Sequence, residues 1–418
     1  MIEGRSAGDG RAGPEAPRAE KTLERRIRAF HWVRLISAVP DRCAGSPGER
    51  EAGERVAAWL RELGFEDVTQ RDVAAGPDPA RSIALHLAVG ALGGLLGGLG
   101  GTVVAGIALY SFRLDQRAGP GLLSRGLRRA TSCSVEARAG ASRPRRRVVL
   151  SASLDAPRTR GALARRLRRA LAFWQSGVVS PARLCERGLQ AATLVALASL
   201  LGGEGSLLRA AQLALTVALG LGVVAAIETG FASATPGAND DASGIAALLT
   251  CAEQLLPQLR DDVEIHVVTG GAGNAGAAGL SEVLDRHPEW RSDRCVLLHF
   301  DRVGGGALHY LRSETATART EYPPRLRELA RRLAEGGAYR EITQTDLVGE
   351  TAARRAAARG LHALALVSLE PGGVPRGDAD SGDVPESLDM EVVVRAADFA
   401  SAIVVAGWRG ESDPLAIV

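Results

Sequence analysis

Aromatic residues and cysteine are scarce in this chain of 418 residues. Aromatics make up 4% of the sequence, so Ala, Gly, Leu and Val supply most of its 46% hydrophobic share. The five cysteines are widely spaced, and none forms a CxxC pair. This spacing excludes a zinc ribbon and argues against a disulfide framework, so we expect reduced thiols in a cytoplasmic setting.

Lysine is nearly absent as well, because Lys21 is the one lysine in the chain. The arginines are unevenly distributed: residues 113–187 contain 18 Arg and four acidic residues, although the net charge of the chain is only +3. Such a block indicates an anionic lipid surface or nucleic acid as a neighbour. No basic motif interleaved with aromatics accompanies it, so we expect lipid and no nucleic acid as a partner.

The first 20 residues contain no apolar segment. They are rich in Gly, Pro, Ala and charge, which predicts a disordered tail and not a signal peptide. We therefore expect the folded domain to span residues 21–418.

Two long apolar stretches interrupt this domain. Residues 82–112 contain no charged residue, and residues 189–229 are broken by a GGEGS turn and Arg209, with Glu228 next to their end. A membrane-spanning helix needs ~20 apolar residues, so the second stretch fits a helical hairpin and the first a short or re-entrant one. Buried helices of a soluble protein are the alternative, but neither stretch has a polar face. We therefore predict hydrophobic helical membrane inserts.

Basic residues flank both inserts. Positive charge beside a span marks the cytoplasmic side of a membrane, so the folded domain is expected to face the cytoplasm. Between the inserts, residues 158–175 form a basic amphipathic segment. It places Leu163, Leu167 and Leu171 on one helical face and arginines on the other, as in a helix lying in the headgroup layer.

Outside the inserts, helix and strand patterns alternate along the chain. Helices are expected at residues 22–36, 49–63, 243–255, 324–334, 347–358 and 390–406. Strands are expected at residues 146–152, 263–269, 295–300, 308–312 and 363–369. This alternation predicts an α/β fold, a three-layer sandwich with a central mixed, mostly parallel sheet.

The stretch TPGANDDASGIAALL (235–249) places Asp240 and Asp241 at the start of a predicted helix. Paired acids in this position can simply cap exposed N–H groups. Five further pieces accompany it along the chain: DRCAGSPGEREAGERVAAWLRELGF (41–65), VVLSASLDAPR (148–158), VEIHVVTGGAGNAGAAGL (263–280), VLLHFDRVGGG (296–306) and GDADSGDVPESLDMEVVVRAADFASAI (377–403). Taken in this order, the six pieces resemble the co-catalytic di-zinc aminopeptidases, the family of the bacterial leucyl aminopeptidases, glutamate carboxypeptidase and glutaminyl cyclase.

The resemblance implies a catalytic centre with two zinc ions, a bridging water and a general base. Asp240 matches the bridging carboxylate of this centre, and Asp301 matches a terminal ligand. Asp155 matches the aspartate that orients a zinc-binding histidine. The resemblance also implies a cis peptide bond between Asp240 and Asp241, and a cleft in which Asp155, Asp240 and Asp301 meet.

The other functional positions of the family carry residues that cannot do its chemistry. The first histidine ligand is replaced by Ser153, the paired glutamates by Gly273 and Asn274, and the last histidine by Ala379. No carboxylate lies between positions 264 and 282, and no histidine lies between positions 86 and 266 or after 362. Two of five expected ligands remain and the general base is missing, so we expect no bound zinc and no other cofactor.

The preferred hypothesis is therefore a membrane-associated pseudopeptidase that binds a peptide, a protein or lipid. One alternative is an active metal-dependent exopeptidase with a non-standard site, in which the three aspartates hold a single divalent cation, since carboxylates suit Mg²⁺ or Ca²⁺. A purely structural membrane scaffold is the third class. The serines at 151 and 153 lack a recognisable His–Asp pair, and GGAGNAG (270–276) lacks the Lys-Ser/Thr ending of a phosphate loop.

Overall fold

A mixed β-sheet forms the centre of the computed structural model, which describes residues 16–117, 121–174, 180–202 and 205–409. Within these residues, nine strands pair in the order β1-β2-β4-β3-β5-β9-β6-β7, with β8 paired to β6. The strands are β1 (Glu66–Pro77), β2 (Arg129–Gly140), β3 (Arg146–Ser153), β4 (Val263–Gly270), β5 (Cys295–Asp301), β6 (Ala307–Thr315), β7 (Arg319–Glu321), β8 (Thr343–Leu347) and β9 (His362–Leu369).

The four central strands, β4, β3, β5 and β9, are mutually parallel, and antiparallel pairs lie toward both edges. Every residue of β5 is buried, as expected for a strand covered on both faces. The five predicted strands are confirmed. β1, β2, β7 and β8 were missed because they carry polar and charged residues on exposed faces, which leaves no continuous apolar run.

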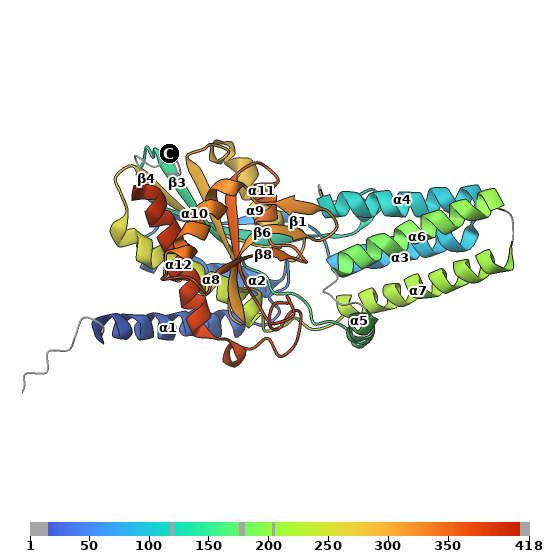
Figure 1. Cartoon of the computed structure of the whole chain (residues 1–418), viewed down its shortest axis with the longest axis horizontal. Coiled ribbons are helices and arrows are strands. Elements are labelled where there is room, and N and C mark those ends of the chain that lie inside the picture. Colours follow the sequence, from blue (N-terminus) through green and yellow to red (C-terminus); the bar gives the residue numbers. More distant parts are fainter. Residues whose placement is uncertain (1–15, 118–120, 175–179, 203–204, 410–418) are drawn as a thin grey trace, which may run out of the picture.

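Helices cover both faces of the sheet, which confirms the predicted α/β sandwich (Figure 1). One face packs against α1 (Ala16–Ser37), α2 (Pro47–Glu62), α8 (Gly244–Leu255), α10 (Pro324–Glu335) and α12 (Met390–Arg409). The other face packs against α9 (Ala278–Arg286) and α11 (Arg354–Ala357).

Two expectations about local structure need correction. The helix predicted over residues 347–358 is reduced to the single turn of α11, because the chain first completes β8 and then forms the loop 348–353. Of the expected N-terminal tail, residues 1–15 lie outside the described residues, whereas α1 already begins at Ala16.

Four long helices form a bundle that projects from one end of the sandwich (Figure 1). They are α3 (Pro79–Leu96), α4 (Gly98–Arg117), α6 (Pro181–Gly202) and α7 (Ser206–Gly230). The turn of the first hairpin lies against the far end of α6, since the Gly98 N–H donates to Ser199 Oγ at 2.6 Å. Each hairpin therefore leaves the sandwich and returns to it. The shorter α5 (Ala162–Trp174) packs against α7 at the base of the bundle.

The outer surface of the bundle is strongly apolar. Most of the large hydrophobic side chains exposed on the described residues belong to these four helices, among them Leu201 at 79% and Leu207 at 84% exposure. By length and composition, α3, α6 and α7 are each able to cross a membrane. At a rise of ~1.5 Å per residue, helices of 18 to 25 residues are about 27–38 Å long, close to the ~30 Å hydrocarbon thickness of a bilayer.

Arginines of the sandwich bind the end of the bundle. Arg354 Nη2 donates to the carbonyl oxygen of Gln116, and Arg355 Nη1 donates to that of Arg117 at 2.9 Å. Both acceptors belong to the last turn of α4, where carbonyl groups have no partner within the helix. Cationic donors at a helix C-terminus also interact favourably with the helix dipole, so these contacts fix α4 against the sandwich.

The hairpin of α3 and α4 predicts opposite effects for two Gly→Ala substitutions. A Cβ atom at Gly93 would lie 2.5 Å from the Ala105 backbone nitrogen, whereas one at Gly106 would meet nothing within 4 Å. We expect Gly93→Ala to force the helices apart and to lower the free energy of unfolding by about 1–3 kcal/mol. Gly106→Ala should raise it by up to about 1 kcal/mol through helix propensity. Thermal unfolding of the detergent-solubilised chain measures both; equal effects of the two substitutions would contradict close packing at Gly93.

Candidate functional site

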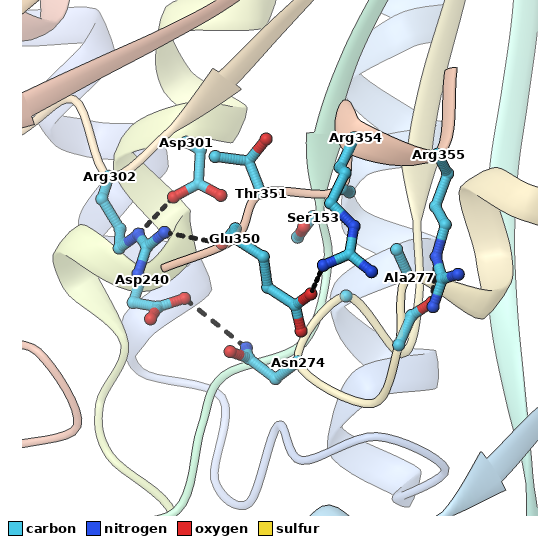
Figure 2. Close-up of a pocket in the computed structure, with 13 residues that line it drawn as sticks. Ser153, Asp240, Asn274, Ala277, Asp301, Arg302, Glu350, Thr351, Arg354 and Arg355 are labelled. Carbon is cyan, nitrogen blue, oxygen red and sulfur yellow. Dashed lines mark hydrogen bonds and ion pairs between the residues drawn. The ribbon is translucent and has the colours of Figure 1, made fainter. Parts of the chain in front are cut away.

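A charged pocket lies at the carboxyl ends of the central parallel strands. It contains about 520 Å³ of empty space, part of it open to solvent. Its walls come from the ends of β3 and β5, the cis-peptide turn before α8, the loop that follows β4 and the loop that leads into α11 (Figure 2). The lining residues are Ser153, Asp240, Gly273, Asn274, Gly276, Ala277, Asp301, Arg302, Glu350, Thr351, Ala352, Arg354 and Arg355.

Asp241 connects three walls of this pocket. The Asp240–Asp241 peptide bond is cis, as the family resemblance predicts. Asp241 Oδ2 accepts a hydrogen bond from the backbone N–H of Ser153 at 3.0 Å, and Oδ1 accepts one from the backbone N–H of Arg302 at 2.9 Å. Asp241 thus holds the ends of β3 and β5 together, while its neighbour Asp240 lines the pocket.

Asp383 holds the same turn from the opposite side. Its Oδ1 accepts from the Asn239 N–H at 2.7 Å, and its Oδ2 accepts from the Asp240 N–H at 3.1 Å. Burial raises the pKa of Asp383 to about 6. The backbone that carries Asp240 is therefore fixed by buried carboxylates on both sides.

Arg302 supplies the positive charge of the pocket floor. Its Nε donates to Asp301 Oδ1, its Nη2 donates to the Glu350 carbonyl oxygen at 3.1 Å, and its guanidinium lies between Asp301 and Asp240 (Figure 2). Burial raises the pKa of Asp301, but the charges of Arg302 and His299 outweigh it and leave the pKa below its ordinary value. Asp301 is therefore a carboxylate paired with a guanidinium.

Of the two acids beside Arg302, Asp240 has less of its negative charge offset by the guanidinium than Asp301 has. Burial, together with the charges of Asp301 and Asp383, raises its pKa to about 7 although Arg302 opposes the shift. The side chain contacts Asn274, whose Nδ2 lies 3.5 Å from Asp240 Oδ1. Arg302 thus acts as the cation that allows two carboxylates to share one buried pocket.

Asp155 lies beneath the pocket and supports the loop that follows β4. It is fully buried and accepts hydrogen bonds from the backbone N–H groups of Gly273 and Asn274, the latter at 3.0 Å. Burial raises its pKa despite these bonds. Asp240 and Asp301 line one pocket, whereas Asp155 does not reach its surface.

Ser153 and Gly273 are in direct contact where the family has a histidine and a glutamate. A Cβ atom at Gly273 would lie 2.4 Å from Ser153 Oγ and 3.0 Å from Asp155 Oδ1. No side chain of any size fits at this position without a shift of the loop. Gly273 therefore leaves no room for a longer side chain while Ser153 and Asp155 keep these positions.

Glu49 of α2 is a second support of this loop, and the sequence analysis did not identify it. Its Oε1 accepts from the Ala272 N–H and from Ser132 Oγ, both at 2.8 Å, and its Oε2 accepts from the Gly45 N–H at 2.7 Å. Burial raises its pKa to about 7, with Asp155 as the next contributor. Glu49 and Asp155 together bind three consecutive N–H groups of the loop.

Ala379, which stands at the position of the last family histidine, is not part of the pocket lining. It adopts a left-handed conformation with φ of 49°, and its carbonyl oxygen accepts from the Arg160 N–H at 3.1 Å. The neighbouring Asp378 binds Arg160 Nη2 at 2.6 Å and Arg168 Nη1 of α5 at 3.2 Å. The segment after β9 is thus tied to the basic amphipathic helix.

The residues of the pocket do not fit the zinc ions that the family implies. In the described part of the chain, no group of three or more His, Cys, Asp and Glu side chains is arranged to hold a metal ion. Zinc sites in proteins use imidazole or thiolate donors beside carboxylates, and the lining contains neither. The Arg302 guanidinium also places a fixed positive charge beside both remaining carboxylates.

The pocket lining also contains four residues that the sequence analysis missed: Arg302, Glu350, Arg354 and Arg355. Arg302 follows Asp301 directly in VLLHFDRVGGG (296–306). An arginine next to a residue that matches a metal ligand could have identified Arg302 from the sequence. The other three lie in a segment that was interpreted as an ordinary helix, so no motif distinguished them from surface charges.

A further buried acid supports a different wall of the pocket, the loop that leads into α11. Glu314 of β6 is fully buried; its Oε2 accepts from the Thr351 N–H at 2.6 Å, and its Oε1 accepts from Tyr322 Oη at 3.1 Å. Burial raises the pKa of Glu314 to about 8. Thr351 lines the pocket, so this acid fixes the wall that carries Glu350 and Arg354.

Comparison with known proteins confirms the family resemblance. The model of Peptidase family M28 matches residues 224–387, a segment that includes Asp240 and Asp301. No curated protein matches the chain significantly.

Solved structures share the fold over most of their length. BSAP, a zinc aminopeptidase from Bacillus subtilis, is 13% identical, with a TM-score of 0.55 over 94% of this chain and 97% of its own. The glutaminyl cyclase of Bacteroides thetaiotaomicron is 13% identical, with a TM-score of 0.53 over 91% and 97%. LapB from Legionella pneumophila is 12% identical, with a TM-score of 0.52 over 96% and 77%. At these identities the likeness shows the fold alone.

The contact between Gly273 and Ser153 predicts a cost for the smallest side chain. Gly273→Ala should displace the loop from Asp155 and lower the free energy of unfolding by about 1–3 kcal/mol. Gly372→Ala is the matched control, because a Cβ atom there meets nothing within 4 Å. Chemical denaturation of both variants measures the difference. If Gly273→Ala behaves like the control, the loop is not packed as described.

The buried Glu314 predicts a stability that depends on pH. Because burial raises its pKa from 4.5 in the unfolded chain to about 8, its contribution is complete below pH 4.5 and is lost as pH rises through about 8. The free energy of unfolding should therefore fall between pH 5 and about 9, and it should fall less steeply in Glu314→Gln. Glu335→Gln on the exposed surface of α10 should keep the wild-type slope. Parallel slopes for the wild type and Glu314→Gln would contradict a protonated Glu314.

Proposed function

We propose that this chain, whose residues 224–387 match peptidase family M28 and whose fold is that of zinc aminopeptidases, is a membrane-anchored pseudopeptidase. In this proposal it retains a pocket at the position of a peptidase active site and binds a peptide segment there without hydrolysing it. The helical bundle anchors it in a bilayer, and the Arg-rich segment contacts anionic lipid. The α/β domain then faces the cytoplasm.

The observation that carries the proposal is the position of Arg302. Its guanidinium pairs with Asp301 and lies beside Asp240, the two acids that match metal ligands of the family. A dication and a guanidinium cannot share this space, because both are drawn to the same two carboxylates and repel each other. The charge that a metal supplies in an active peptidase is supplied here by a side chain that cannot activate water.

The loss of the general base supports the same reading. A glutamate cannot be accommodated at Gly273 while Ser153 occupies the end of β3. The neighbouring Asn274 carries an amide, which cannot accept a proton from water near neutral pH. The glutamate that the family uses for proton transfer and the ligands that hold its water-activating metal thus have no counterparts at Gly273, Asn274 and Ser153.

Membrane anchoring is supported by the surface of the bundle. Most of the large hydrophobic side chains exposed on the described residues lie on α3, α4, α6 and α7, and both hairpins begin and end at the sandwich. Such a surface is unfavourable in water and favourable in lipid. The arginines of α5 and of the adjacent loops lie at the base of the bundle, at the level of the headgroups if the bundle is inserted.

Replacing Arg302 by methionine tests the proposal. Arg302→Met keeps the length of the side chain but leaves Asp240 and Asp301 without their cation, so the free energy of unfolding should fall by about 3 kcal/mol. Mg²⁺ or Ca²⁺ should restore part of this loss by binding the two carboxylates. The wild type should show no shift with Mg²⁺, Ca²⁺ or Zn²⁺. Thermal unfolding in detergent, with and without each ion, measures these effects.

Arg331→Met on the exposed surface of α10 is the control. This variant should keep the wild-type stability, and none of the ions should shift its thermal unfolding. Elemental analysis of the wild type after equilibration with Zn²⁺ provides the second measurement. Stoichiometric zinc that is lost in Asp240→Ala, together with hydrolysis of peptides, would overturn the proposal in favour of an active exopeptidase.

A further inference from the structure

The carboxylate of Glu350 lies inside the pocket and is bound by Arg354. Arg354 Nη1 donates to Glu350 Oε2 at 2.6 Å (Figure 2). The two partners differ in their surroundings, because the side chain of Arg354 is 8% exposed and that of Glu350 is 45% exposed. A fixed guanidinium thus holds a carboxylate that reaches it from the solvent side.

The position of Arg354 does not depend on Glu350. Its second nitrogen, Nη2, donates to the Gln116 carbonyl oxygen at the end of α4. The backbone of the same loop is held by Glu314, which accepts from the Thr351 N–H, and by Arg302, which donates to the Glu350 carbonyl oxygen. If the side chain of Glu350 swings into solvent, the Arg354 guanidinium therefore stays in the pocket wall.

The charges of this wall are unbalanced. Arg354 and Arg355 are adjacent and both line the pocket. Arg355 binds the carbonyl oxygens of Gly276 at 3.0 Å and Arg117 at 2.9 Å, and within the described residues no carboxylate forms an ion pair with it. Arg354 is thus paired with the Glu350 carboxylate while the adjacent Arg355 guanidinium is bound by carbonyl oxygens alone, so the wall attracts a further negative group.

We infer that the Arg354–Arg355 wall is a receptor for a carboxylate of the bound peptide, and that Glu350 occupies this receptor when the peptide is absent. Arginine is suited to this role because its planar donors match the geometry of a carboxylate. The inference rests on the proposed peptide-binding function and specifies the ligand group. Either the C-terminal carboxylate of a peptide or an acidic side chain would supply this chemistry.

Removal of the internal carboxylate provides a test by gain of binding. A ligand must displace Glu350 from Arg354. Its apparent affinity is therefore the intrinsic affinity multiplied by the fraction of molecules in which Glu350 has left Arg354. The full chain in detergent is titrated with N-acetylated tetra-alanine, with its C-terminal amide, and with an amidated tetrapeptide containing one glutamate. Ligand-observed NMR measures the dissociation constants of the wild type, Glu350→Ala, Arg354→Lys and the control Glu335→Ala.

We expect Glu350→Ala to bind at least one of the two carboxylate peptides about tenfold more tightly than the wild type does, and to bind the fully amidated tetra-alanine no better. The peptide that gains affinity identifies the source of the carboxylate. Arg354→Lys should weaken binding of that peptide by about fivefold or more, because the planar fork is lost. A gain of affinity cannot result from misfolding, so Glu350→Ala keeps the test decisive if Arg354→Lys proves unstable.

Two results would overturn the inference. If the amidated and carboxylate peptides bind equally well and Glu350→Ala changes neither, the pocket binds peptides without a carboxylate receptor, and the proposed function stands alone. If no peptide binds to the wild type or to Glu350→Ala, both the inference and the peptide-binding function fail. Cleavage of the peptides during the titration would contradict the pseudopeptidase proposal. The same comparison of dissociation constants would still decide whether Arg354 and Arg355 bind a carboxylate.

Discussion

The ion pair between Arg302 and Asp301 is the interaction on which the pocket depends. Parallel strands deliver their following residues to one edge of the sheet, and here that edge receives Asp240, Asp241 and Asp301 within one buried region. Carboxylates so close together cannot all be charged without a cation. In a metallopeptidase the cations are metal ions, whereas in this chain the residue next to Asp301 turns its guanidinium back into the site. Arg302 thus supplies a positive charge beside these acids, and it lowers the pKa of Asp301.

The loop after β4 is held by a close contact with β3 and by buried acids beneath it. Where the family has a histidine and a glutamate, Ser153 and Gly273 are in contact, and the loop after β4 has closed onto β3. Its N–H groups bind two buried carboxylates, Asp155 and Glu49. Asp155 matches the aspartate that orients a zinc-binding histidine in the family, and here it binds backbone N–H groups and supports the loop.

The pocket and the helical bundle share residues. Arg354 and Arg355 line the pocket and also bind the last carbonyl oxygens of α4. On the other side, Asp378 joins the segment after β9 to Arg168 of α5. Because its walls are held by the base of the bundle, the pocket has a fixed position relative to that bundle.

The sequence alone determined the α/β sandwich, the central buried strands and the identity of the two surviving acids. These depend on local apolar runs and on residues at fixed spacings after strands, which survive large changes elsewhere. The outer strands β1, β2, β7 and β8 could not be predicted, because their exposed polar residues hide the strand pattern. The roles of Arg302, Glu350 and Arg354 were decided only by the tertiary structure. Whether an arginine faces solvent or a buried carboxylate depends on loops far apart in the chain. The spacing of residues in the sequence does not predict where those loops meet.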